Sequence, residues 1–171
     1  IVCQKFRRVW RNDSGKYHIQ IIYIRCTDHF FKFIHAGQEF LGTKNGNQNS
    51  YNAGDAVNKL DWERHDEYMN VVQAVKFFID LRKHNKCFRY YDYEDMHQHV
   101  FINNIYYRMV EYHLTQDEGD YKEFKIYFNP SYDVITIGIE DDFKILYSMS
   151  NERIENGQLN VFGVSMVVCA R

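Results

Sequence analysis

The polar stretch from Gly42 to Asn58 carries side chains of the kind that bind sugars. Amide and carboxylate groups can satisfy paired hydroxyls, and an aromatic ring can cover the apolar face of a sugar. The candidates of this kind are Asn49, Tyr51, Asn52, Asp55 and Asn58. The alternative is an Asn-rich turn that only folds the loop, because Asn and Asp tolerate left-handed backbone conformations. The sequence leaves both interpretations open.

Two residues that flank this stretch are ambiguous in the same way. Glu39 follows an apolar run, so its carboxylate could hydrogen-bond a sugar hydroxyl or a neighbouring catalytic group, or it could form a structural hydrogen bond beneath the loop. Trp62 could stack on a sugar ring, or it could anchor the loop to the helix that we expect to follow. We retain Glu39 as a sixth candidate substrate-binding residue.

Three further patterns are less specific. His97 and His99 could form half of a metal site on a strand, but on a helix their rings would point apart, and no Cys or carboxylate lies at ligand spacing. We therefore expect no metal site. The acids between Asp61 and Glu67 resemble a catalytic pair, yet charges that open a helix are usually solvated. The basic and aromatic residues 5–11 could contact nucleic acid, although so short a stretch is more often ordinary surface.

The elements that must position these residues follow from hydrophobic periodicity. Residues 30–37 form a short apolar run closed by Gly, which predicts a strand buried on both faces. The stretch Gly42 to Asn58 is then a long loop, and such loops in compact domains are usually functional. Apolar residues recur at helical spacing from Asp66 to His84, and we expect a second short helix at Glu94 to His99, capped by Asp92.

After Val100 the apolar period changes to two, which is typical of strands. We expect strands at Phe101 to Leu114, Tyr121 to Phe128, Val134 to Ile139, Phe143 to Tyr147 and Val164 to Val168. Several short strands bounded by turn residues indicate a small antiparallel sandwich. The chain is therefore mixed at first and all-β after about residue 100.

Composition narrows the functional classes. With 171 residues and a formal net charge of -2, the chain has no long-range field that favours nucleic acid. Its apolar runs are far shorter than the roughly 18 residues that span a bilayer, so we expect no membrane partner. Cys3, Cys26, Cys87 and Cys169 are scattered, which fits reduced thiols and a cytoplasmic location. The first residues lack a signal peptide's order and an initiator Met, and we expect a fragment.

Several motifs together resemble type I pullulanases of the α-amylase superfamily over about residues 31–170. They are Phe33-Ile34-His35-Ala36-Gly37-Gln38-Glu39-Phe40, Thr43-Lys44-Asn45-Gly46, Asn49-Ser50-Tyr51-Asn52, Asp55, Asn58-Lys59-Leu60-Asp61-Trp62, Leu81-Arg82-Lys83-His84, Cys87-Phe88-Arg89, Tyr121-Lys122-Glu123-Phe124-Lys125-Ile126, Phe128-Asn129-Pro130 and Phe143-Lys144-Ile145-Leu146. Residues 1–30 do not match what the family carries upstream.

The resemblance implies an α+β fold: the last strand-loop-helix unit of a (β/α)8 barrel followed by a small antiparallel β-sandwich. It assigns residues 1–30 to an unmatched N-terminal segment, 31–99 to the terminal barrel strand, substrate-facing loop and helix, and 100–171 to the C-terminal β-sandwich domain. Barrel active sites lie at the C-terminal ends of strands, so the loop would border the substrate groove.

The resemblance also implies the chemistry of the whole enzyme, which is hydrolysis of α-1,6-glucosidic linkages in pullulan, starch or glycogen-like glucans without a cofactor. Retaining glycosidases need two carboxyl groups about 5 Å apart. In this family they come from strands upstream of the matched region, so we expect no catalytic residue here and no activity of this chain alone. The alternatives are a non-catalytic carbohydrate-binding or interaction β-sandwich module, or the product of a truncated or frameshifted gene.

Overall fold

The computed structural model describes residues 34–47, 49–105 and 109–171. The predictions for residues 1–30, and the first part of the strand expected at residues 30–37, lie outside the described residues. The last part of that expected strand, residues 34–37, forms irregular backbone and a turn. No described strand lies beside these residues to supply the hydrogen bonds that a strand requires, and Gly37 turns the chain with φ 88°.

Three short helical turns lie in and just before the predicted loop, the first of them before Gly42. They are η1 (Gln38–Phe40), η2 (Lys44–Gly46) and α3 (Asp55–Asn58). The hydroxyl of Thr43 accepts a hydrogen bond from the backbone N–H of Asn45 and so begins η2. The loop is therefore more ordered than its polar composition suggested, although no turn is longer than four residues.

Two consecutive helices replace the single predicted one. Helix α4 (Trp62–Glu67) begins at Asp61, whose side chain accepts a hydrogen bond from the N–H of Arg64 at 3.3 Å. Helix α5 (Met69–His84) follows after a break at Tyr68 (φ -105°, ψ 33°). The prediction of a helix from Asp66 was therefore wrong at its start, because the acids there end α4 rather than open α5. The predicted end at His84 is confirmed.

Two shorter elements connect α5 to the sheets. The turn η3 (Lys86–Phe88) buries Cys87 and Phe88. Helix α6 (Tyr93–His99) is capped by Asp92, whose Oδ1 accepts a hydrogen bond from the N–H of Glu94 at 2.8 Å. The predicted short helix and its cap are thus confirmed. No described helix is long and apolar enough to cross a membrane.

The strands form two antiparallel sheets. They are β1 (Val100–Ile105), β2 (Met109–Thr115), β3 (Glu123–Asn129), β4 (Ile135–Gly138), β5 (Lys144–Ser148), β6 (Ile154–Glu155), β7 (Gln158–Val161) and β8 (Ser165–Ala170). The first sheet has the order β1-β2-β3-β8-β5, and the second has the order β4-β7-β6. The single strand predicted from Phe101 to Leu114 was wrong, since β1 and β2 pair with each other.

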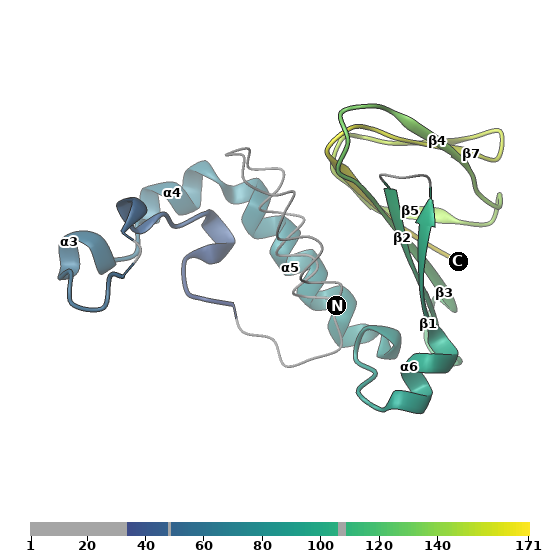
Figure 1. The fold of residues 1–171 in the computed structure, drawn as a ribbon, viewed down its shortest axis with the longest axis horizontal. Coiled ribbons are helices and arrows are strands. Elements are labelled where there is room, and N and C mark those ends of the chain that lie inside the picture. Colours follow the sequence, from purple (N-terminus) through teal and green to yellow (C-terminus); the bar gives the residue numbers. More distant parts are fainter. Residues whose placement is uncertain (1–33, 48, 106–108) are drawn as a thin grey trace.

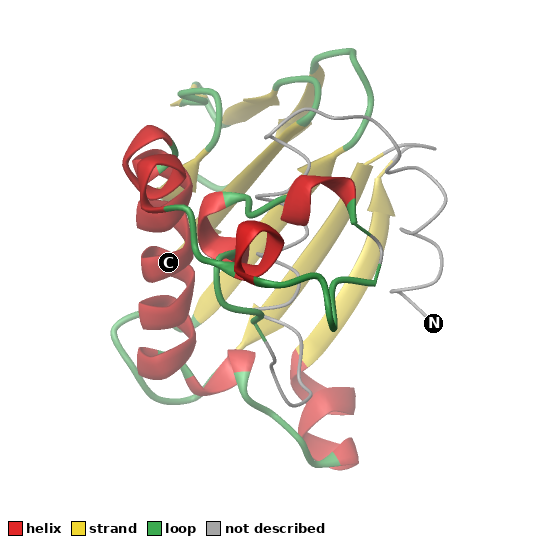
Figure 2. Ribbon diagram, turned by 90° about the vertical axis from the view of Figure 1, so that its left-hand side faces the viewer, coloured by secondary structure: helices red, strands yellow, loops and turns green. Residues whose placement is uncertain are grey.

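The five-stranded sheet lies between two layers (Figures 1 and 2). On one face, Phe78 and Val75 of α5 pack against β-sheet residues such as Phe124 and Val168. On the other face, Tyr127 and other residues of β3 and β8 pack against Leu159 and its neighbours in the smaller sheet. Every residue of β8 is buried, because this strand is central and covered on both faces. The sheets are thus the stable part that holds the helices and the loop.

Candidate functional site

The loop that carries most of the sequence candidates extends away from the sheets, and α3 lies at the end of the molecule farthest from β1–β3 (Figure 1). None of its described residues from Leu41 to Asp61 is buried. Its conformation therefore depends on hydrogen bonds rather than on apolar burial.

Four of the six candidates project from this loop into solvent. Tyr51 is 93% exposed, and Asn49, Asn52 and Asp55 are also exposed. Tyr51 lies in a turn closed by a hydrogen bond from the N–H of Ala53 to the carbonyl of Ser50 (3.1 Å). The loop thus exposes one aromatic ring, two amides and a carboxylate, which are groups that suit a polyhydroxyl ligand.

The other two candidates make hydrogen bonds in the loop or in the turn just before it. The amide of Asn58 donates to the carbonyl of Ser50 at 2.7 Å, and the carbonyl of Asn58 accepts from Nζ of Lys44 at 3.0 Å. Oε2 of Glu39 accepts from the N–H of Gly37 at 3.0 Å. The bond from Asn58 holds the backbone at Ser50, next to Tyr51, whereas the bond to Glu39 holds the turn at Gly37. The structure therefore gives Asn58 a structural hydrogen bond within the loop and gives Glu39 one in the turn that precedes it.

Trp62 stands where the loop meets α4. Its ring centroid lies 5.9 Å from that of Phe40, which is buried, and 5.7 Å from that of His65. The three rings form a small cluster that joins the loop to the helix, as expected of an anchor. Because Trp62 is nevertheless 63% exposed, part of its ring remains available to solvent.

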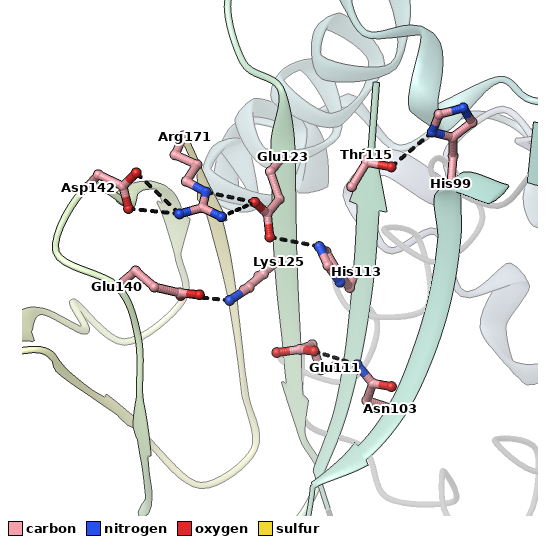
Figure 3. A network of polar contacts seen from close by, with 10 residues as sticks. All are labelled: His99, Asn103, Glu111, His113, Thr115, Glu123, Lys125, Glu140, Asp142 and Arg171. Atoms are coloured by element: carbon pink, nitrogen blue, oxygen red, sulfur yellow. Dashed lines mark hydrogen bonds and ion pairs between the residues drawn. The ribbon is translucent and has the colours of Figure 1, made fainter. Parts of the chain in front are cut away.

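The two histidines considered as a metal half-site have different neighbours. Nδ1 of His99 lies 2.9 Å from Oγ1 of Thr115, and its ring stacks on Tyr90 (Figure 3). The ring of His97 instead lies against Tyr93, one turn earlier in α6. The helix therefore directs the rings to different partners, and the described residues contain no cluster of three or more His, Cys, Asp or Glu side chains that could hold a metal.

A network of charged side chains crosses the five-stranded sheet, and the sequence did not indicate it (Figure 3). Arg171 contacts Glu123 at 2.5 Å and Asp142 at 3.2 Å. Nε2 of His113 lies 2.8 Å from Oε1 of the same Glu123. The network joins β2 and β3 to the end of β8. The alternation of side chains along β2 and β3 places the charged residues of each strand on one face. Which of them come into contact depends on the register between the strands.

A second ion pair lies next to this network (Figure 3). Nζ of Lys125 is 2.7 Å from Oε2 of Glu140, and this hydrogen bond lowers the pKa of Glu140 below its ordinary value of 4.5. The Arg171 network and the Lys125–Glu140 pair both connect elements of the fold. Each charged group in them lies next to a group of opposite charge.

One carboxylate is buried among the described residues, that of Glu152. Its Oε2 accepts from Oγ of Ser148 at 2.8 Å and from the N–H of Ser150 at 2.9 Å, and Oε1 accepts from Oγ of Ser165. These hydrogen bonds attach the segment that follows β5 to the first residue of β8. Their donors are groups of serine rather than a second acid, so the arrangement differs from the carboxyl pair of a glycosidase.

Two thiols are buried, that of Cys169 in β8 and that of Cys87 in η3. Burial raises the pKa of Cys169 to about 12 and also raises the pKa of Cys87. Because the thiolate is the nucleophilic form, neither side chain is suited to covalent catalysis. Cys3 and Cys26 lie outside the described residues.

Comparison with known proteins agrees with the motifs. The pullulanase of Bacillus subtilis (strain 168) is 33% identical over 112 residues, a match that covers 64% of this chain and 16% of that protein. The structure of pullulanase from Anoxybacillus sp. LM18-11 in complex with maltotetraose superposes with a TM-score of 0.84 at 23% identity, covering 93% of this chain and 24% of that one. No protein-family model matches the chain.

A third relative has a higher identity than the Anoxybacillus protein. Pullulanase from Paenibacillus barengoltzii in complex with maltohexaose and α-cyclodextrin is 27% identical with a TM-score of 0.81, covering 91% of this chain and 25% of that one. The helix and the two sheets therefore have the arrangement of a segment found in glycoside hydrolases. Within that class the chain resembles the pullulanases, which confirms the resemblance noted in the sequence. It spans about a quarter of these solved relatives or less.

Proposed function

We propose that this chain supplies the C-terminal part of a pullulanase-type debranching enzyme, which hydrolyses α-1,6-glucosidic linkages in pullulan, starch or glycogen-like glucans. The observation that carries the proposal is that sequence and structure both match pullulanases. The sequence identity to a curated pullulanase is 33%, and the TM-score to a solved one is 0.84. In this proposal residues 31–99 form the end of the barrel, and residues 100–171 form the sandwich that supports it.

Within such an enzyme the exposed side of the loop faces the glucan. Tyr51 supplies the ring that covers a sugar face, while Asn49, Asn52 and Asp55 hydrogen-bond its hydroxyls. Asn58 holds the backbone next to Tyr51, and Glu39 holds the turn from which the loop starts. Support comes from their exposure and hydrogen bonds, and from relatives that were crystallised with maltotetraose and maltohexaose.

The same proposal gives this chain no hydrolytic activity alone, because the family's catalytic carboxylates come from strands upstream of the matched region. In the described residues, the one buried carboxylate, Glu152, is bound by serines. We expect the purified 171-residue chain to release no reducing sugar from pullulan. Turnover by the pure chain would overturn this part of the proposal.

The decisive experiment is complementation. A pullulanase shortened so that it ends before the matched segment is mixed or co-expressed with this chain, and pullulan hydrolysis is followed by reducing-sugar release. We expect activity only when both polypeptides are present. A matched control adds the chain with Phe78→Ala, which removes a fully buried ring that joins α5 to the sheet and should abolish the gain.

The alternative function, a non-catalytic carbohydrate-binding or interaction module, predicts a different pair of results. Complementation would fail, yet the isolated chain would be retarded during electrophoresis through amylopectin. Restored hydrolysis would instead favour the enzyme segment, because a separate module has no interface that completes a barrel.

A further inference from the structure

The sequence contains two Asn-Gly pairs, Asn45-Gly46 and Asn156-Gly157, and the structure gives them similar backbone conformations. Both asparagines are exposed, and both have φ 51°, in the left-handed region. Their glycines also have positive φ, 74° for Gly46 and 70° for Gly157. Because Asn is a thermolabile residue and the Gly after it has no Cβ to hinder its backbone nitrogen, each pair is chemically capable of deamidation. A difference in reactivity between them must come from their surroundings.

The two pairs differ in what holds the N–H of the glycine. The N–H of Gly46 donates to the carbonyl of Thr43 at 3.0 Å, within the turn η2. Gly157 is instead the second residue of a two-residue turn, in which the flanking residues Glu155 and Gln158 pair with each other. Within the described part of the chain, the N–H of Gly157 has no acceptor. The nitrogen that must react is therefore held at one pair and free at the other.

We propose that Asn156 is a site of spontaneous deamidation, which reacts in preference to Asn45. Water or hydroxide takes the N–H proton of Gly157, and its nitrogen forms a bond to Cγ of Asn156 while the bond from Cγ to the amide nitrogen breaks. Ammonia leaves, and a succinimide ring remains. A water molecule then opens the ring at either carbonyl, which gives aspartate or isoaspartate. One water is consumed and one ammonia is released, and the reaction does not depend on the proposed function.

The modification changes the turn between β6 and β7. Both products add a carboxylate next to Glu155 and near Asp141, whose Oδ1 lies 3.5 Å from the position that a Cβ of Gly157 would take. Isoaspartate also adds one carbon to the main chain, which changes the loop length that sets the hairpin register. Because β6 has two residues, the pairing of Ile154 with Leu159 should weaken. Hydrogen exchange in β6 should be faster after modification and unchanged in β8, and equal exchange in β6 before and after would contradict this consequence.

The test is peptide mapping of the full folded chain by mass spectrometry during incubation at mildly alkaline pH. The peptide that contains Asn156 should gain the mass difference between an NH2 and an OH group, and in heavy-oxygen water it should also carry the heavy isotope. Deamidation should be about threefold to tenfold faster at Asn156 than at Asn45, the factor that one ordinary hydrogen bond provides. The matched variant is Asn156→Gln, which keeps an amide but requires a larger ring and should lose the modification.

A denatured control separates the effect of structure from that of sequence. In concentrated urea the hydrogen bond of Gly46 is lost, so Asn45 and Asn156 should react at similar rates. Three outcomes would overturn the inference. They are no mass gain at Asn156 in the folded chain, a reaction at Asn45 that is as fast or faster there, and an equal preference for Asn156 in urea, which would assign the preference to neighbouring residues rather than to the fold.

Discussion

The loop at residues 41–61 and the two sheets are held by different interactions. The loop has no buried residue in its described part and is held by a few hydrogen bonds, such as those of Asn58. The sheets bury two clusters of apolar side chains, and β8 is buried throughout. Stability should therefore reside in the sheets with α5, while ligand recognition can vary in the loop with little effect on folding.

The largest expected effect is loss of the folded state at alkaline pH. Burial raises the pKa of Cys169 from its ordinary value of 9.0 to about 12, and it raises the pKa of Cys87 and Tyr127 as well. The unfolded chain then releases protons that the folded chain retains, so stability is intact below about pH 9 and falls as the pH rises. Circular dichroism of the β signal between pH 8 and 12 measures this. An unchanged unfolding midpoint at pH 11 would contradict it.

Truncation inside the core should be the next largest effect. Phe78 is fully buried, and its ring lies 4.9 Å from that of Tyr147 in β5. Phe78→Ala should lower the free energy of unfolding by about 3–5 kcal/mol in urea titration. Tyr51→Ala in the loop is the matched aromatic control and should change it by less than about 0.5 kcal/mol. Equal losses in the two variants would remove the contrast between the regions.

Loop variants should lower activity without lowering stability. In the complemented enzyme, Tyr51→Ala and Asp55→Ala should each reduce kcat/KM for pullulan about tenfold, because each removes a contact to the glucan. Tyr91→Ala, which removes an exposed ring between η3 and α6, should leave kcat/KM unchanged. If both loop variants retain wild-type kinetics, the loop does not border the substrate.

The smallest expected effect concerns a surface ion pair at the edge of the sheets. Lys125 lowers the pKa of Glu140, so their attraction is present at neutral pH and is lost as the pH falls through that lowered pKa. Because Glu140 is half exposed, Glu140→Gln should cost no more than about 0.5 kcal/mol at pH 7. Urea titrations should show this difference shrinking at acidic pH. A difference that grows in acid would be inconsistent with the pair.

Capping residues and terminal charges in the sequence predicted the helix ends that carry them. Asp92 marked the start of α6, and the bases before Asn85 marked the end of α5. The hairpin of β6 and β7 was missed although a signal existed, since Asn156-Gly157 is a typical two-residue turn and both residues have positive φ. The division of β1 from β2 was missed because residues 103–110 contain no Gly or Pro.

The site was predictable in composition and less so in orientation. An Asn-rich stretch with one Tyr left a sugar-binding loop and a purely structural turn both open, and Asn49 and Asn58 are the same residue type with different contacts in the structure. Asn58 bonds the carbonyl of Ser50, eight residues earlier, and such a contact depends on how the loop closes.

The position of β8 has a consequence for biosynthesis. This strand is inserted between β3 and β5, so β5 has no neighbour in its sheet until residues 165–170 arrive. During translation, the sheet cannot close until the nascent chain has reached Ala170 and that strand has left the ribosome. Until then one edge of β3 stays unpaired. The emerging polypeptide depends on chaperones, or on rapid completion of the sheet, to avoid pairing with other chains.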